Sequence, residues 1–579
     1  MKESIRTLLP YLKRHQSQLA LGMGALVMKD LLAVLSPLIM KKGVDALTTH
    51  FELRDVFLFA FLLIALSAVK GLFQYWMRVV LIGVSRDLEF DLRNDLFAHL
   101  VDLSSNFYQR FRTGDIMTRA TSDLNAVRMM AGPGVMYWCE TTLLFILAVG
   151  VMASTDWQLT LLALSPAPFI VMVVILFGRR IHVRHDAVQK QFSEISSRVQ
   201  ENLSGVRVVR AYAQEDHEMQ IFERLNRNYI RESLRLARLS GAFSPLLQAL
   251  IGTTFLMVLW GGGRRLLAGQ LTIGSFVMFH TYMGMLIWPM IAMGWVVNLI
   301  ERGNASLARI KEMLNEKPSI ASPENPTIVA HPCGAIELDN VTVKFDGRLA
   351  LDRVSLKIEA GQTVAIVGRT GCGKTTLIRL LARLIDADGG VVRMDGVDVR
   401  QWGLSQLRAQ IAVVPQETFL FGMTLAENIA LGVPHATREQ VQWAANVAGL
   451  DTDLKAFPNG LETIVGERGI TLSGGQKQRT AIARAVLRNP KLLILDDALS
   501  SVDTVTEEKI LTALTKVMDG RTNILISHRV STVRHADRIF VLEAGSVAEQ
   551  GTHDQLLAAK GYYADLHQKQ MLEQELEAI

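Results

Sequence analysis

Apolar residues gather in the first half of the chain, where they form six long stretches. Each stretch is long enough, or nearly so, to cross the ~30 Å hydrocarbon core of a bilayer as a helix that rises ~1.5 Å per residue. Helices buried in a soluble protein are rarely apolar on every side over such a length. The pattern therefore predicts six membrane-spanning helices, at about Gln18–Met40, Val56–Gly83, Met130–Ser154, Leu159–Phe177, Phe243–Gly263 and Phe276–Leu299.

The basic residues between these stretches predict how the helices are oriented. The connections Val84–Met129 and Arg179–Ser240 contain six and twelve Lys and Arg residues, whereas Ala153–Leu159 contains none. Connections on the cytoplasmic side of a membrane are enriched in Lys and Arg. Both long connections and both ends of the chain are therefore expected in the cytoplasm, which makes this a multi-pass protein of the cell inner (cytoplasmic) membrane.

The long connections themselves have the spacing of helices. Arg86–Leu103 and Gln189–Leu239 place apolar residues at helical intervals with charged residues between them, which predicts solvated helices that continue the spans. Turns are expected near Arg112–Asp115 and Asn202–Gly205, where glycine and polar residues interrupt the pattern. Residues 1–14 are predicted to form a short amphipathic helix at the membrane surface.

Five ionisable residues fall at or near membrane depth, where a charge is costly and usually faces a partner or a cavity. Two roles are open: ion pairing inside the helix bundle, and lining of a transport path. Arg78 is also placed to extend its charged end toward the membrane surface. Because Lys29 and Asp30 are adjacent, they are not expected on one helix face. The five residues are Lys29, Asp30, Lys70, Arg78 and Glu140.

The second half of the chain has a different pattern, in which short apolar runs alternate with helical segments. Ile336–Val343 and Ala350–Ile358 are typical of strands. Residues Lys317–Pro332 are rich in Pro, Ser and Asn, as linkers are. The expected organisation is a transmembrane domain at 1–315, a linker at 316–333 and an α/β domain at 334–579.

Composition narrows the class of protein further. Of 579 residues, 49% are apolar and 20% are charged, and the net charge is +5. A typical soluble domain has about 25% charged residues. The modest net charge and the lack of a basic face argue against a nucleic-acid partner. Cys139, Cys333 and Cys372 lie far apart and show no metal-ligand spacing.

A glycine-rich loop between a strand and a helix is the strongest chemical signal in the chain. It follows a β-branched run that starts at Thr363 and precedes a helical pattern that starts at Leu377. Glycines let backbone N–H groups close around phosphate oxygens, and the positive end of the helix dipole adds to the attraction. In this pattern Lys374 is expected to reach the outer phosphates and the Thr375 hydroxyl to bind Mg²⁺. The predicted phosphate-binding residues are Gly368, Arg369, Thr370, Gly371, Cys372, Gly373, Lys374, Thr375 and Thr376.

Two further segments support a nucleotide site. Lys491–Asp496 is an apolar strand that ends in a carboxylate, which is expected to lie near the Mg²⁺ ion. A second glycine turn opens the helical segment Lys477–Leu487 and forms another candidate anion site. This turn consists of Leu472, Ser473, Gly474, Gly475 and Gln476.

With these motifs in this order, the chain resembles the exporter type of ATP-binding cassette (ABC) transporter over its full length. The resemblance implies a six-helix all-α transmembrane domain followed by an α/β P-loop nucleotide-binding domain, with ATP and Mg²⁺ as cofactors. It also implies a dimer in which two cassettes enclose two ATP molecules. Each ATP lies between the Walker A loop of one chain, here Gly368–Thr376, and the LSGGQ signature of the other, here Leu472–Gln476.

The resemblance assigns further roles at matching positions. Phe345 takes the place of the aromatic residue that stacks on adenine, Gln416 matches the Q-loop glutamine, and His528 matches the switch histidine that holds the γ-phosphate. Asp503 matches the D-loop, which acts with the signature on the ATP of the partner chain. Glu467 matches a loop that touches the coupling regions, to which the two cytoplasmic turns correspond. The expected Mg²⁺ residues are Thr375, Gln416 and Asp496.

One position departs from the family pattern. The strand Lys491–Asp496 matches the family's Walker B motif, which ends in an aspartate, here Asp496. The next residue is usually Glu, the general base, but here it is Asp497. Because Asp is one methylene shorter, its carboxylate is set back by roughly 1.5 Å, and a general base must lie about 2.6–3.2 Å from the water it activates. A misplacement of about 1 Å can cost about 10²-fold in rate. A harmless conservative change is the competing interpretation.

These features favour one function and leave others open. The first hypothesis is a heterodimeric exporter of small amphipathic molecules, drugs or lipids, in which a second ABC half-transporter supplies the main hydrolytic site. The alternative is a homodimeric lipid flippase with two slow, equal sites. A third hypothesis is an ATP-gated channel or membrane regulator, against which the intact signature and His528 argue. The six spans exclude a soluble ATPase of the DNA-repair kind.

Overall fold

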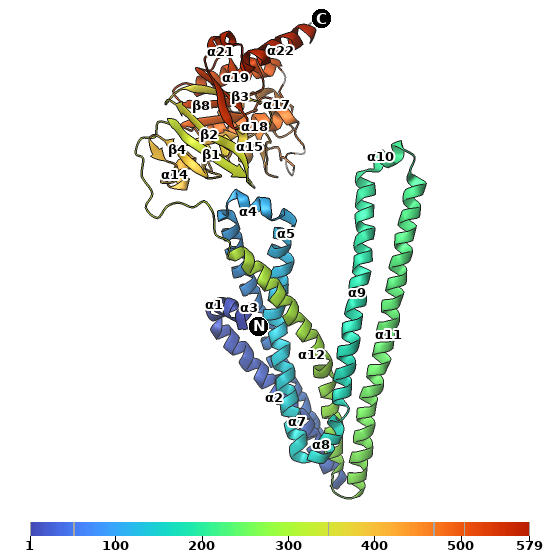
Figure 1. Cartoon of the computed structure of the whole chain (residues 1–579). Helices are drawn as coiled ribbons and strands as arrows, with labels where there is room; N and C mark the ends of the chain where they lie inside the picture. Colours follow the sequence, from blue (N-terminus) through green and yellow to red (C-terminus); the bar gives the residue numbers. More distant parts are fainter. Residues whose placement is uncertain are drawn as a thin grey trace. The chain divides into compact units, whose positions relative to one another are not determined.

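The computed structural model describes residues 2–49, 53–345, 347–466, 469, 471–502 and 504–577. It divides into two compact units, which differ in architecture (Figure 1). The first unit comprises Met1–Asp102 and Phe111–Glu316, and the second comprises Leu103–Arg110 and Lys317–Ile579. A short segment of the first long connection, 103–110, therefore belongs with the C-terminal unit.

The first unit is entirely helical in the residues that the structure describes, and six of its helices are long and apolar enough to cross a membrane. These six run Gln16–Thr48, Leu53–Asp102, Thr113–Thr155, Trp157–Ser204, Glu215–Leu267 and Ile273–Leu314. The predicted spans are thereby confirmed. In finer detail the unit contains α1 (Lys2–Arg14), α2 (Gln16–Thr49), α3 (Leu53–Asp102), α5 (Thr113–Thr118), α6 (Leu124–Met129), α7 (Val135–Thr155), α8 (Trp157–Leu164), α9 (Ala167–Ser204), α10 (Val206–Ala211), α11 (Glu215–Leu267) and α12 (Ile273–Leu314), with π-helical turns η1 (Arg119–Asp123) and η2 (Met130–Gly134).

The helices continue well beyond the apolar stretches, as the spacing predicted. Figure 1 shows α9 and α11 side by side, joined at one end by the short α10. The break between α9 and α10 falls at Gly205, as expected. The other predicted turn, Arg112–Asp115, is only partly correct: Arg112 has extended backbone, but the other three residues belong to α5, which begins at Thr113.

An ion-paired cluster lies inside the first unit. The Lys29 ammonium lies 2.7 Å from the Asp30 carboxylate and 2.6 Å from the Glu140 carboxylate. Asp30 is fully buried. Lys29 and Asp30 form an ion pair although adjacent residues do not share a helix face, because the long Lys stem lets its ammonium reach a neighbouring carboxylate. For Lys29, Asp30 and Glu140 the structure supports interior ion pairing, whereas the role in lining a transport path stays a prediction.

The second unit contains two sheets in its described part. A four-stranded antiparallel sheet has the order β2-β1-β4-β5, and a six-stranded sheet has the order β10-β9-β3-β8-β7-β6. In the latter all neighbouring strands are parallel except β10 with β9. The strands are β1 (Ile336–Phe345), β2 (Arg348–Ile358), β3 (Thr363–Gly368), β4 (Gly389–Met394), β5 (Val397–Asp398), β6 (Ile411–Val414), β7 (Leu492–Asp496), β8 (Thr522–Ile526), β9 (Arg538–Glu543) and β10 (Ser546–Gly551).

Helices pack around these sheets, and the unit contains more than one hydrophobic cluster. One hydrophobic cluster joins both sheets and contains the buried Trp402, and another joins β6 and β7 to α15, α16 and α18. The helices of this unit are α4 (Ser105–Arg110), α13 (Lys374–Leu381), α14 (Leu404–Ala409), α15 (Leu425–Ala430), α16 (Arg438–Val447), α17 (Asp451–Ala456), α18 (Gly474–Leu487), α19 (Thr504–Met518), α20 (Val530–Val533), α21 (His553–Ala559) and α22 (Tyr562–Glu577), with the 3₁₀ turn η3 (Gly460–Glu462).

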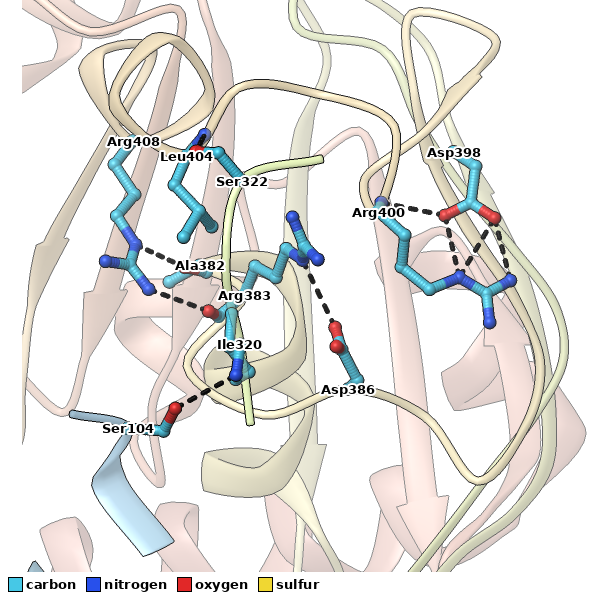
Figure 2. Close-up of polar contacts among 10 residues, drawn as sticks. All are labelled: Ser104, Ile320, Ser322, Ala382, Arg383, Asp386, Asp398, Arg400, Leu404 and Arg408. Carbon is cyan, nitrogen blue, oxygen red and sulfur yellow. Dashed lines mark hydrogen bonds and ion pairs between the residues drawn. The ribbon is translucent and has the colours of Figure 1, made fainter. Parts of the chain in front are cut away.

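The Pro- and Ser-rich segment 317–332, which we call the strap, is held by hydrogen bonds against the rest of the second unit, to which it belongs. Figure 2 shows Ser104 accepting a hydrogen bond from the backbone N–H of Ile320 at 3.0 Å. Further along, Ser322 accepts one from the N–H of Leu404, the first residue of α14, also at 3.0 Å. On the other side of α14, Arg408 donates to the carbonyl oxygen of Arg383, just beyond the end of α13. A set of polar contacts thus leads from residue 104 toward α13.

Candidate nucleotide-binding site

Residues from four distant parts of the sequence meet at one edge of the six-stranded sheet. The parallel strands β3, β6, β7 and β8 end at this edge, because Ile526 pairs with Ile366 on one side and with Asp496 on the other. The glycine loop follows β3, Gln416 follows β6, and His528 follows β8. The carboxyl edge of a parallel sheet is where ligands bind in folds of this kind.

The glycine loop has a backbone that only glycine adopts without strain. Gly371 and Gly373 have φ values of +84° and +106°. A Cβ atom at Gly373 would lie 2.7 Å from the carbonyl oxygen of Ala350, and one at Gly368 would collide with the carbonyl oxygen of Leu542. The loop is therefore a cradle with no room for side chains at these positions, which fits the backbone N–H binding of phosphate.

Lys374 is the first residue of α13, and its side chain folds back onto the loop. Its ammonium donates hydrogen bonds to the carbonyl oxygens of Gly368 at 2.7 Å and Arg369 at 3.1 Å, and the residue is buried. Thr375 follows in the first turn of α13 and is exposed. A buried cation and the positive end of a helix dipole thus act on the same cradle, and the residues present fit a nucleotide phosphate chain.

The carboxylate at the end of β7 is buried beside a second one. Asp496 is 5% exposed. Burial, reinforced by the neighbouring Asp497, raises the pKa of Asp496 to about 6, and the Lys374 ammonium opposes the rise. A buried carboxylate suits Mg²⁺, which prefers oxygen ligands. Mg²⁺ bound here would neutralise charge on the phosphate oxygens.

Asp497 is in contact with His528. The backbone of Asp497 is left-handed, with φ of +45°, and its N–H donates to the carbonyl oxygen of Ile526 at 2.9 Å. Its carboxylate accepts a hydrogen bond from the backbone N–H of His528 at 3.2 Å and lies 3.4 Å from Nε2 of the same histidine. Asp tolerates this backbone conformation better than most residues do.

A cavity of about 230 Å³ brings three of the predicted residues together. Gln416, Asp497 and His528 all line it. Of the described residues in its lining, none belongs to the signature Leu472–Gln476. Gln416 is an exposed residue. The cavity is large enough for water molecules, as a hydrolytic site requires.

The same cavity contains a buried carboxylate that the sequence pattern did not single out. Glu507 of α19 forms an ion pair with Arg529 and accepts a hydrogen bond from the Thr532 hydroxyl at 2.8 Å. It is buried on the face of α19 that also buries Ile510 and Leu514. The sequence does contain a signal for this burial: Glu507 precedes Ile510 by three positions and Leu514 by seven, so the three residues share one stripe of the helix.

The signature residues lie at the start of α18. The Ser473 hydroxyl accepts a hydrogen bond from the N–H of Gln476 at 3.3 Å, and the Gln476 side chain accepts one from the N–H of Ser473 at 2.9 Å. This is a capping box, which leaves other N–H groups at the helix end open to an anion. A Cβ atom at Gly475 would lie 2.9 Å from the carbonyl oxygen of Ser501. Gly474 belongs to the same turn, and Leu472 is buried behind it.

Gln478 links the signature helix to the residues after β7 and was also missed. Its side chain donates to the Ser500 hydroxyl at 2.9 Å and accepts from the N–H of Ser501 at 2.9 Å.

Phe345, at the end of β1, is half-buried and packs against the core. Asp503 and Glu467 lie outside the described residues.

Comparison with known proteins matches both halves of the chain to one family. Residues 19–290 match the family described as ABC transporter transmembrane region, and residues 351–500 match the family described as ABC transporter. The solved structure of a bacterial Atm1-family ABC exporter with ATP bound superposes with a TM-score of 0.79, at 28% identity, over 96% of this chain and 98% of that one. This agreement confirms the predicted fold class.

Curated relatives match over nearly the whole length. The probable multidrug resistance ABC transporter ATP-binding/permease protein YheI of Bacillus subtilis (strain 168) is 36% identical over 97% of both chains. The multidrug resistance-like ATP-binding protein MdlA of Escherichia coli (strain K12) is 37% identical, over 98% of this chain and 96% of the relative. The ATP-dependent lipid A-core flippase of Syntrophus aciditrophicus (strain SB) is 33% identical, over 98% and 94%.

These matches agree with the predicted location in the membrane, with several spans and a cytoplasmic nucleotide-binding domain. They also support ATP hydrolysis coupled to transport as the activity. The chain therefore belongs to the ABC transporter family, as an exporter-type half-transporter that carries its transmembrane and ATP-binding regions in one polypeptide.

Proposed function

We propose that this chain is one subunit of a heterodimeric exporter of small amphipathic molecules, and that its own Walker site hydrolyses ATP slowly. The observation that carries the proposal is that the position of the general base is Asp497, whereas the signature sequence of the same chain is intact. The chain would thus bind ATP in its own Walker loop and complete a faster site on the partner with Leu472–Gln476.

The individual roles follow the resemblance. The Walker A loop Gly368–Thr376 holds the phosphates, and Phe345 stacks on adenine. Asp496 takes part in binding Mg²⁺, and His528 contacts the γ-phosphate. Asp503 acts with the signature on the ATP of the partner. The remaining Mg²⁺ residues are Thr375 and Gln416.

Two features of Asp497 support a slow site. Its side chain is one methylene shorter than that of Glu, which sets the carboxylate back by roughly 1.5 Å from where a base must be. The carboxylate also accepts the backbone N–H of His528, so part of its hydrogen-bonding capacity is used within the protein. The buried Glu507 does not replace it, because its two oxygens already serve Arg529 and Thr532.

A second subunit is also supported by exposed apolar residues around α10. Leu203, Val208 and Tyr212 are exposed at the turn between α9 and α11. Apolar side chains grouped in this way mark interaction surfaces, and the turn matches one of the family's coupling regions. This is the surface that we expect to contact the nucleotide-binding domain of the second subunit.

The substrate class rests on the relatives. Those named for multidrug resistance are 36% and 37% identical to this chain, which favours export of drug-like amphipathic molecules. A homodimeric lipid flippase is the second candidate, because a relative named as an ATP-dependent lipid A-core flippase is 33% identical over 98% of this chain. In that case both sites would carry Asp497 and hydrolyse at equal, low rates.

One purification separates the two candidates. The tagged chain is isolated from membranes of the native cell and also expressed alone, and both samples are placed in liposomes for ATPase and transport assays. The heterodimer predicts that the native sample contains a second half-transporter with Glu after its Walker B aspartate, and that the chain alone has little activity. Brisk ATP-dependent transport by the chain alone would instead support the homodimer.

A further inference from the structure

The last helix of the chain packs against the switch region through one face. Tyr563 of α22 is fully buried, and together with Leu566 it packs in a cluster with Val530 and Val533 of α20. Residues 563, 566 and 570 lie at helical spacings of three and seven and so share a stripe. A polar residue, Gln570, therefore occupies the next position of an otherwise apolar contact face.

Gln570 hydrogen-bonds to the backbone on both sides of Arg529. Its side-chain oxygen accepts the N–H of Val530 at 2.8 Å, and its side-chain nitrogen donates to the carbonyl oxygen of His528. A side-chain amide can make both bonds at once because it carries an acceptor and a donor. The backbone that carries the switch histidine is thus clamped by a residue from the end of the chain.

The opposite side of this segment is anchored separately. Arg529 pairs with the buried Glu507 of α19, and Thr532 donates to the same carboxylate. The backbone at His528 is therefore fixed from two directions, while the side chain of His528 is 47% exposed. The arrangement fixes where the imidazole is attached and leaves its ring free to face a ligand.

The same helix also reaches the Walker A loop. The guanidinium of Arg369 lies over the ring of Tyr562, the first residue of α22, at 5.6 Å from the ring centroid. This is a cation–π distance. One helix thereby contacts two loops of the nucleotide site, the phosphate loop through Tyr562 and the switch loop through Gln570.

We propose that Gln570 is a positioning residue for the switch loop, which sets His528 at the correct distance for the terminal phosphate of ATP. The inference rests on the proposed contact of His528 with the γ-phosphate, but not on the heterodimer or on the slow site. Loss of the clamp should weaken binding of ATP, which has the γ-phosphate, more than binding of ADP, which lacks it.

The test uses the full chain in lipid nanodiscs with Mg²⁺ and measures equilibrium affinities by displacement of a fluorescent nucleotide. Gln570→Met removes both hydrogen bonds and keeps the length of the side chain. Gln568→Met is the matched control, because Gln568 lies on the same helix and is exposed. Gln570→Met is expected to weaken ATP about three- to tenfold, since it removes hydrogen bonds that are each worth about a factor of five, and to leave ADP within twofold.

A double-mutant cycle with His528→Ala distinguishes positioning from general stability. If Gln570 acts through His528, adding Gln570→Met to His528→Ala changes the ratio of ATP to ADP affinity no further. The inference would be overturned if Gln570→Met left the ratio of ATP to ADP affinity unchanged. It would also be overturned if the double variant changed that ratio further than His528→Ala does. An unchanged ratio in His528→Ala alone, with a shift in Gln570→Met, would overturn it as well and would also refute the proposed role of His528.

A second variant protects the test against misfolding. In Gln570→Glu the carboxylate still accepts the N–H of Val530 but cannot donate to the carbonyl oxygen of His528. The same loss of ATP over ADP binding is expected. Because the affinity for ATP is measured with a non-hydrolysable analogue that keeps the γ-phosphate, no turnover occurs, and a failure of the heterodimer proposal leaves the outcome unchanged.

Discussion

The carboxylate of Asp497 lies 3.4 Å from Nε2 of His528 and accepts the backbone N–H of that histidine at 3.2 Å. The residue proposed at the position of the general base and the proposed switch residue are therefore in direct contact, although they lie 31 positions apart in the sequence. A longer acidic side chain at this position would extend past the switch backbone toward the cavity. That difference of one methylene group can be tested directly.

We expect Asp497→Glu to raise the ATPase rate of the chain expressed alone by at least about tenfold. The reason is that the added methylene moves the carboxylate forward by roughly 1.5 Å, and a 1 Å error can cost about 10²-fold. Phosphate release at steady state measures the change. Asp497→Asn should do little in the wild-type background, and Lys374→Ala should remove the gained activity. Loss of all ATPase activity in Asp497→Asn would show that the short side chain is itself the working base.

Asp496 should make the stability of the nucleotide-free protein depend on pH. Its pKa is about 6 when folded and about 3.9 when unfolded, so the folded state binds the extra proton. Its contribution to stability is therefore full below about pH 4 and is lost as the pH rises through 6. Asp496→Asn should stabilise the nucleotide-free protein at pH 7.5 by roughly 1–3 kcal/mol, and by about half as much at pH 5. Thermal unfolding followed by tryptophan fluorescence measures both differences; a stabilisation that is equal at the two pH values would contradict the burial argument.

Ser473→Ala separates the structural role of the signature from its role in binding. Loss of the cap should cost about 1 kcal/mol of stability and should also slow hydrolysis at the site on the partner. Thr437→Ala is the matched control, because Thr437 caps α16 through the same kind of capping box with Gln440. It should cost a similar free energy of unfolding without slowing the ATPase of the complex. Equal effects of the two variants on ATPase activity would mean that the signature serine acts only as a helix cap.

Ser322→Ala tests whether the strap stabilises the start of α14. The N–H of Leu404 would lose its acceptor, so amide hydrogen exchange at 404–406 should accelerate about fivefold, the equivalent of about 1 kcal/mol. Ser319→Ala is the control, since Ser319 is an exposed residue of the same strap. Unchanged exchange in Ser322→Ala would mean that α14 does not depend on the strap.

The sequence predicted what depends on local pattern and missed what depends on distant partners. The membrane spans were predictable because a bilayer imposes length and apolarity, and the Walker A loop because its glycines and Lys374 are adjacent in sequence. Glu507 and Gln570 were not predictable, since their partners at 528–532 are chosen by the packing of α19 and α22. The ion pair between Lys29 and Asp30 was not anticipated, because the rule for helix faces does not consider how far a lysine side chain can bend.

The length of α11 has a mechanical consequence. Of its span Glu215–Leu267, the apolar part begins near Phe243, so about 28 residues, or roughly 40 Å, continue outside the hydrocarbon. Such an arm acts as a lever: a tilt of about 5° within the membrane would swing the α10 tip by some 3–4 Å, roughly the rise of two residues in a helix. A small rearrangement of the helices around a transported molecule would therefore displace the cytoplasmic tip at α10 by about the diameter of an atom.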